Sequence, residues 1–141
     1  DMNNVCFSLV EAVNLIEGLK LTICTHSKIS QKNKWKKNSN IFLVNELKDI
    51  DLQSVKCVMT DVFVSMNDDD SEEKIDLLKP YNVNSKLMSK TNANSVFMHC
   101  LPAQIGFEVS EEVFRSPKSI VWKQAYNRMV SQIKLIQFMY Q

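Results

Sequence analysis

The sequence predicts an α/β fold, an open parallel sheet of Rossmann-like type with helices on both faces. Short apolar runs alternate along the chain with stretches in which apolar residues recur every three or four positions. These runs are largely apolar throughout, which is typical of parallel strands buried on both faces. The length of 141 residues suits one domain, which we expect to cover residues 1–141.

The first predicted helix begins at Asn3 or Asn4, whose amide side chains can cap it, and Gly18 is placed to end it. Residues 19–25 alternate apolar and polar side chains and are rich in β-formers, so they predict the first strand. A strand normally precedes a capped helix in a βα unit. We therefore interpret Asp1 as the end of a strand that this sequence does not include.

Residues 26–40 are polar and rich in lysine, with Ile29 and Trp35 as the large apolar residues. A basic patch beside an aromatic residue can indicate nucleic-acid binding, but we prefer a solvated short helix or loop because no second basic stripe accompanies it. The formal charge of +1, from 17 basic and 16 acidic residues, also disfavours polyanion binding. We expect no nucleic-acid partner.

The middle of the chain predicts two further strands and a helix. Residues 41–44 and 55–60 are short apolar runs, predicted to be buried parallel strands joined by a polar connector over 46–53. An acidic stretch over 67–73 leads into an amphipathic helix, which Pro80 ends.

The last third predicts a short helical piece over 85–89 and a strand over the apolar run 96–98. A turn of helix follows near 111–114, and residues 119–121 are a candidate for a last short strand. Apolar residues at four- and three-residue spacing over 124–141 predict a long terminal helix.

Several classes of protein are disfavoured by what the sequence lacks. Its cysteines stand singly, which favours reduced thiols in a cytosol-like compartment over a disulfide framework. His26 and His99 are the only histidines and lie far apart, so no metal site is predicted. No apolar run reaches the ~20 residues of a membrane helix and the start is not signal-like, so we expect a cytoplasmic protein without a membrane partner. With glycines only at Gly18 and Gly106, the G-x-G-x-x-G turn of a nucleotide-binding oxidoreductase is excluded.

Ligands of open parallel sheets bind beyond the carboxyl ends of the strands, which makes the polar residues there site candidates. Asn3 and Asn4 could hold a carboxylate with the helix N-terminus, or could simply cap the helix. Asp61 could pair with a substrate ammonium or form a turn. Arg128 could polarise a carbonyl oxygen, neutralise an anion, or be a plain surface residue.

The run His99-Cys100-Leu101-Pro102 is the most specific of these features. A buried structural cysteine is its plain interpretation. A nucleophilic pair is the alternative, but neighbours on a strand point to opposite faces, which places His99 poorly for deprotonating Cys100. We therefore expect no covalent thiol catalysis.

Five blocks of sequence together resemble the second domain of the ornithine carbamoyltransferases, within the wider transcarbamylase family. The blocks are Asp-Met-Asn-Asn-Val at 1–5, Thr-Asp-Val-Phe-Val-Ser-Met at 60–66, Phe-Met-His-Cys-Leu-Pro-Ala at 97–103, Glu-Val-Ser-Glu-Glu-Val-Phe at 108–114, and Ser-Ile-Val with Ala-Tyr-Asn-Arg at 119–121 and 125–128. Their order and spacing cover nearly the whole chain. Where the family usually continues Ser-Met-Gly, this chain has Asn67, and its stretch 26–46 is shorter than expected.

The resemblance implies a set of site residues. The α-amino and α-carboxylate groups of L-ornithine would be held by Asn4, Asp61, Ser65 and Met66. The reacting carbamoyl group and amine would face Cys100 and Leu101, with Arg128 on the carbamoyl oxygen. By the same resemblance, the catalytic candidates are Asp61, Cys100 and Arg128.

The implied reaction is attack by the side-chain amine of ornithine on carbamoyl phosphate, giving citrulline and phosphate without a cofactor. The family's phosphate-binding Ser-Thr-Arg-Thr segment belongs to a first domain and has no counterpart in this sequence. Carbamoyl phosphate would therefore bind mainly through that absent domain, and the complete enzyme is expected to be a homotrimer. The alternatives are a non-catalytic domain, or a transcarbamylase for putrescine or acetylornithine.

Overall fold

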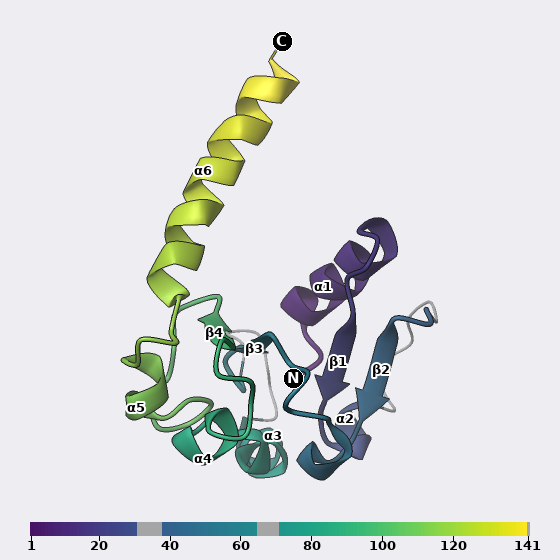
Figure 1. Ribbon diagram of the computed structural model, residues 1–141, viewed down its shortest axis with the longest axis vertical. Coiled ribbons are helices and arrows are strands. Elements are labelled where there is room, and N and C mark those ends of the chain that lie inside the picture. The colour runs from purple at the N-terminus through teal and green to yellow at the C-terminus, as the bar shows by residue number, and fades with distance from the viewer. Residues whose placement is uncertain (31–37, 65–70, 141) are drawn as a thin grey trace. The chain divides into compact units, whose positions relative to one another are not determined.

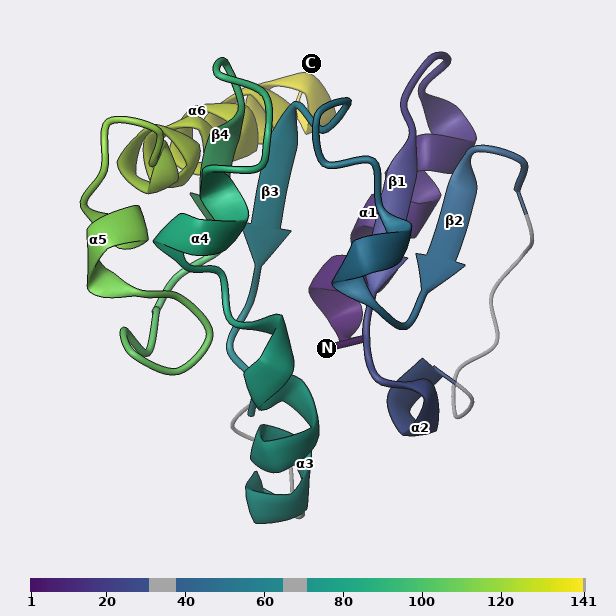
Figure 2. The same cartoon turned by 60° about the horizontal axis from the view of Figure 1, so that its bottom comes forward.

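The computed structural model describes residues 1–30, 38–64 and 71–140, which fall into two compact units. Unit 1 comprises Asp1–Leu52 and Phe63–Asn82, and unit 2 comprises Gln53–Val62 and Val83–Gln141. Each unit holds one two-stranded parallel sheet flanked by helices (Figures 1 and 2). The predicted α/β class with parallel strands is thereby confirmed, although the described strands form two small sheets. The single domain over 1–141 stays a prediction.

Unit 1 contains the sheet of β1 and β2. Its elements are α1 (Asn4–Leu15), β1 (Leu21–Cys24), α2 (Ser27–Ser30), β2 (Ile41–Val44), a 3₁₀ turn (Leu47–Asp49), α3 (Ser71–Leu78) and a second 3₁₀ turn (Lys79–Tyr81). The parallel register runs from Leu21 opposite Ile41 to Cys24 opposite Val44. A small apolar core of Met2, Val10 and Ile23 joins α1 to this sheet.

Local sequence explains the helix ends of unit 1. Asn3 caps α1, because its side-chain oxygen accepts hydrogen bonds from the backbone N–H groups of Val5 and Cys6. Pro80 lies in the 3₁₀ turn directly after α3, as predicted. Part of the lysine-rich stretch forms α2, while its residues 31–37, including Trp35, lie outside the described residues.

Unit 2 contains the sheet of β3 and β4. Its elements are β3 (Cys57–Thr60), α4 (Ser85–Met88), β4 (Val96–His99), α5 (Glu111–Phe114) and α6 (Val121–Met139). The register runs from Cys57 opposite Val96 to Thr60 opposite His99, so both strands end at the same edge. Phe97, Val109 and Val121 are fully buried and form the centre of this unit's core.

The predicted last strand over 119–121 is wrong. Ser119 makes an isolated parallel bridge to Phe97, and the chain then enters α6 at Val121. The backbone pairs with β4 on both sides of this bridge, because Phe97 N–H donates to Lys118 O and Ile120 N–H donates to Phe97 O. Ile120 and Val121 have high strand propensity, but α6 begins at Val121, so the chain leaves β4 after the bridge at Ser119.

Helix α6 begins three residues before the predicted position and leaves the rest of unit 2 after its first turns (Figure 1). From Ala125 to Tyr140 all of its residues are exposed. Within the described part of the chain, no helix has the length and apolarity needed to cross a membrane.

Candidate functional site

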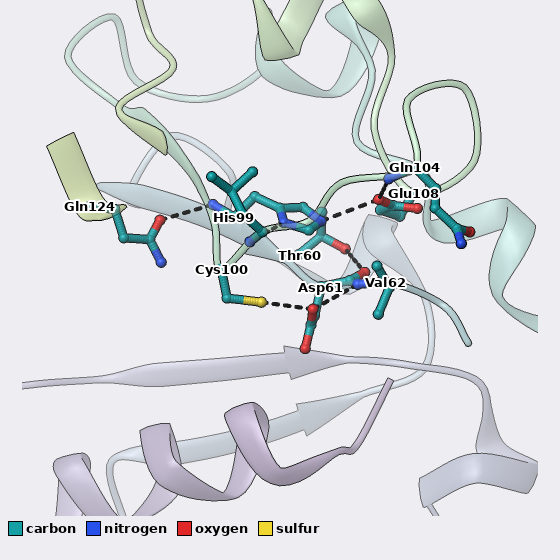
Figure 3. Close-up of polar contacts among 9 residues, drawn as sticks. Thr60, Asp61, Val62, His99, Cys100, Gln104, Glu108 and Gln124 are labelled. Carbon is teal, nitrogen blue, oxygen red and sulfur yellow. Dashed lines mark hydrogen bonds and ion pairs between the residues drawn. The ribbon is translucent and has the colours of Figure 1, made fainter. Parts of the chain in front are cut away.

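The carboxyl ends of β3 and β4 place the two most specific candidates side by side. Thr60 is paired with His99, so the next residues, Asp61 and Cys100, leave the sheet at the same edge. Cys100 Sγ donates a hydrogen bond to Asp61 Oδ1 at 2.7 Å (Figure 3). Both residues are half-buried, so the pair is partly shielded and still reachable from solvent.

Asp61 is fixed by its own neighbourhood as well. The backbone N–H of Val62 donates to Asp61 Oδ1 at 2.8 Å, and the hydroxyl of Thr60 donates to the Asp61 carbonyl at 3.3 Å. This contact joins adjacent residues, whereas in an Asx turn the carboxylate accepts from the N–H two residues on. The contact orients the carboxylate locally, which is compatible with the site interpretation of Asp61.

The thiol of Cys100 is held in its protonated form. Burial raises the pKa of Cys100 to about 12, and the hydrogen bond to Asp61 and that carboxylate's charge act in the same direction. The positive charge of Arg128 lowers this pKa, as a smaller effect. At neutral pH Cys100 is thus a hydrogen-bond donor to Asp61, whereas a thiol nucleophile needs the thiolate.

The imidazole of His99 lies in a fully buried network. Its Nδ1 accepts from Leu101 N–H at 2.9 Å, and its Nε2 lies 3.2 Å from Glu108 Oε1. Because Nδ1 is an acceptor, the ring proton belongs on Nε2 and the imidazole is neutral. The backbone N–H of His99 also donates to Gln124 Oε1 at 3.0 Å, which ties β4 to the first turn of α6.

Glu108 completes this network from the far side of the loop. Its Oε1 accepts from Gln104 N–H as well as facing His99 Nε2. Its Oε2 is buried and has no hydrogen-bond partner among the described residues. Sequence reasoning missed the roles of Glu108 and Gln124, because nothing in their spacing from His99 signals contact.

The backbone between these residues is unusual at Leu101. Its φ of 57° lies in the left-handed region, which costs a non-glycine residue roughly 1–2 kcal/mol. The Leu101–Pro102 peptide bond is cis. The hydrogen bond from Leu101 N–H to His99 is the contact that holds this turn.

The separation of His99 and Cys100 differs from the prediction. Strand alternation was expected to keep them apart, but β4 ends at His99 and their ligand atoms, together with Asp61, lie within 4.8 Å of one another. Hydrogen bonding separates them instead, since the thiol donates to Asp61 and both ring nitrogens are engaged elsewhere. Among the described residues, a metal ion at this place would meet only Cys100 and Asp61 as accessible ligands, and it would have to displace the thiol proton.

The remaining candidates are distributed over the chain. Arg128 is exposed on α6 in unit 2, and its positive charge lowers the pKa of Cys100 slightly. Leu101 is half-buried. Asn4 is the exposed first residue of α1 and belongs to unit 1. Ser65 and Met66, like Asn67, lie outside the described residues. The structure thus gathers Asp61, Cys100, Leu101 and Arg128 in one unit.

Known proteins resemble this chain along its whole length. Residues 1–139 match the family model described as "Aspartate/ornithine carbamoyltransferase, Asp/Orn binding domain". An ornithine carbamoyltransferase of Rhodopseudomonas palustris is 40% identical over 136 residues, covering 94% of this chain and 44% of the relative. Another, of Methanobrevibacter smithii, is 39% identical over 142 residues, covering 94% of this chain and 46% of the relative.

A solved structure shows the same fold. The ornithine carbamoyltransferase of Burkholderia thailandensis superposes with a TM-score of 0.78 at 26% identity, covering 98% of this chain and 44% of that one. The chain therefore spans less than half the length of these relatives.

Proposed function

The chain belongs to the aspartate/ornithine carbamoyltransferase family, and on that premise we propose that it forms the ornithine-binding part of an ornithine carbamoyltransferase. Together with a carbamoyl phosphate-binding part, it would transfer the carbamoyl group to L-ornithine and release citrulline and phosphate. The observation that carries the proposal is the contact between Cys100 and Asp61 at the common end of β3 and β4.

The proposed mechanism begins with substrate charge. The Asp61 carboxylate, oriented by Val62 N–H and by the Cys100 thiol, attracts the α-ammonium of ornithine. Asn4, Ser65 and Met66 are proposed to complete the binding of the α-amino and α-carboxylate groups. This arrangement leaves the side-chain amine of ornithine free to approach the carbamoyl carbon.

The chemical step needs orientation more than a protein nucleophile. The neutral amine of ornithine attacks the carbonyl carbon, and the bond from that carbon to the phosphate oxygen breaks with its electron pair going to phosphate. The proton that the amine loses passes to the departing phosphate. Arg128 is proposed to stabilise the charge that develops on the carbamoyl oxygen. Cys100, as a neutral thiol, and Leu101 position the reacting groups.

Helix α6 supports the requirement for a second part. Large apolar side chains recur on it at spacings of four and three, and they are 47–87% exposed: Trp122, Tyr126, Met129, Ile133, Ile136 and Tyr140. An apolar seam of this size normally marks an interaction surface. We propose that the carbamoyl phosphate-binding part covers this seam, and that the complete enzyme is a cytoplasmic homotrimer.

The test measures ornithine binding and citrulline formation by the intact enzyme that contains this chain. Calorimetry with L-ornithine should show binding heat, while putrescine and acetylornithine should show far less. Asp61→Asn should lower kcat/KM for ornithine, which corresponds to a loss of roughly 2–5 kcal/mol of transition-state stabilisation. This is the scale for breaking a shielded charge pair.

Asp76→Asn, the same change on the exposed surface of α3, is the matched control and should leave kcat/KM unaltered. Equal activity of Asp61→Asn and the unmodified enzyme would remove Asp61 from the site. Absence of ornithine binding by the unmodified enzyme would leave the non-catalytic alternative.

A further inference from the structure

We propose that the buried pair of His99 and Glu108 is a positioning device for the reaction: it holds the loop from Leu101 to Gln104 so that Cys100 and Leu101 keep their orientation toward the substrates. The inference rests on the proposed function. It assigns a role to two side chains that touch neither substrate in that mechanism, and it follows from the hydrogen bonds drawn in Figure 3.

The pair is attached to both ends of the loop. Leu101 N–H donates to His99 Nδ1 at one end, and Gln104 N–H donates to Glu108 Oε1 at the other. The contact between His99 Nε2 and Glu108 Oε1 at 3.2 Å closes the connection between the two ends. Since both side chains are fully buried, solvent cannot replace either bond without opening the core.

The loop needs such a support because its backbone is not the one its sequence prefers. Leu101 adopts a left-handed conformation, which leucine rarely does, and its N–H is satisfied by His99. Without that acceptor, Leu101 would relax toward an ordinary conformation and shift the adjoining Cys100. A displacement of about 1 Å at reacting groups can lower a rate by roughly a hundredfold.

A purely structural role explains Glu108 poorly. Its carboxyl group has no solvent exposure, and one of its two oxygens has no hydrogen-bond partner in the described part of the chain. Burying an incompletely paired carboxyl group costs stability, and an apolar residue would fill the same space more favourably. The compensating benefit is the geometry of the loop.

Four variants of the intact enzyme separate the three contacts of the device. His99→Gln keeps a donor toward Glu108 but loses the acceptor for Leu101 N–H, whereas His99→Asn keeps that acceptor and loses the link to Glu108. Glu108→Ala removes the acceptor for both His99 and Gln104. Glu108→Gln retains an oxygen for both donors, and is therefore the conservative rescue.

We expect His99→Gln and Glu108→Ala to lower kcat for citrulline formation by roughly 10- to 100-fold, with KM for ornithine changed less than about threefold. Glu108→Gln should stay within about threefold of the unmodified kcat. Ser95→Ala is the matched control, because it deletes the hydrogen bond that the buried Ser95 donates to Val55 O at the other end of the same strands, and it should leave kcat unchanged.

An unchanged kcat in folded His99→Gln and Glu108→Ala would overturn the inference, and so would an equal loss in Ser95→Ala. If Glu108→Ala does not fold, His99→Gln decides the question, because it removes the acceptor for Leu101 N–H. If the unmodified enzyme forms citrulline and the kcat of His99→Gln and of Glu108→Ala is unchanged, only the positioning role is rejected. An unmodified enzyme that forms no citrulline from ornithine and carbamoyl phosphate would reject the proposed function and the inference together.

Discussion

His99 and Cys100 are sequence neighbours at the end of β4, but their side chains have opposite relations to solvent and to charge. The His99 imidazole is fully buried, neutral, and hydrogen-bonded on both nitrogens to groups of the loop that follows. The Cys100 thiol is half-buried and makes its hydrogen bond to a carboxylate on the neighbouring strand end. In the proposed function, His99 would hold the shape of the loop and Cys100 would lie beside the reacting groups.

This difference teaches that one strand end can supply both a buried anchor and a partly exposed polar group. The strand stops at His99, and the left-handed residue Leu101 turns the chain immediately afterwards. Cys100 is therefore held between a buried anchor and a turn. Three changes, taken from the largest expected effect to the smallest, test whether the two neighbours really differ in this way.

The buried contact between His99 and Glu108 should have the largest effect on the free energy of unfolding. Glu108→Ala leaves the N–H groups of His99 and Gln104 without an acceptor inside the core, so the free energy of unfolding should fall by about 3 kcal/mol. Denaturant titration measures this loss. Glu108→Gln, which keeps an oxygen at the same place, should lose less than about 1 kcal/mol.

An exposed ion pair provides the matched reference for that measurement. Glu111 and Arg115 form an i, i+4 pair at 2.8 Å on the surface of α5, with both side chains largely exposed. Deleting that contact through Arg115→Ala should cost at most about 0.5 kcal/mol. A similar cost at both sites would mean that the His99–Glu108 contact has no special weight.

The half-buried Cys100 should tolerate a conservative change. Cys100→Ser keeps a small hydrogen-bond donor to Asp61, so kcat of the intact enzyme should fall by less than about tenfold, or 1.4 kcal/mol. A covalent thiol mechanism predicts near-complete loss instead. Mass spectrometry of the enzyme mixed with carbamoyl phosphate alone would detect the carbamoyl adduct on Cys100 that would contradict this expectation.

The smallest effect near neutral pH concerns the titration of the same thiol. The pKa of Cys100 is raised from the ordinary value of 9.0 to about 12, because burial and Asp61 oppose the thiolate. The native state therefore binds this proton more tightly than the unfolded chain. The corresponding stabilisation is complete below about pH 9 and is lost as the pH rises toward 12.

Alkylation mapped by peptide mass spectrometry tests this prediction residue by residue. Cys100 should stay nearly unreactive in the folded protein at pH 9, and in Asp61→Asn its reaction should begin at a lower pH. Denatured protein provides the reference rate for an unperturbed thiol. Rapid alkylation of Cys100 at pH 7 in the folded state would show that the thiolate is accessible.

The residues at the strand ends could be predicted from the sequence, because the residues just before them indicate where each strand ends. An apolar run before Asp61 and another before Cys100 indicate two strand ends, and parallel strands bring such ends to one edge. The cap at Asn3 and the stop at Pro80 follow equally local rules. These predictions depend on a few adjacent residues and on no distant contact.

The supporting network could not be predicted in this way. Glu108 reaches His99 across an irregular loop, and Gln124 reaches it from a helix 25 positions later, so no periodicity connects them. The failed strand at 119–121 has the same cause, since its one bridge to Phe97 depends on where α6 begins. Such contacts are set by tertiary packing.

The apolar seam along α6 has a practical consequence for handling the protein. Side chains such as Trp122 and Tyr140 are exposed in the described part of the chain. Exposed apolar side chains of this kind favour self-association at high protein concentration. A preparation of the 141-residue chain by itself is therefore expected to sediment increasingly fast as it is concentrated and to bind dyes that fluoresce on apolar surfaces. In a cell, the same surface would make this chain a target for chaperones and proteases until it is covered.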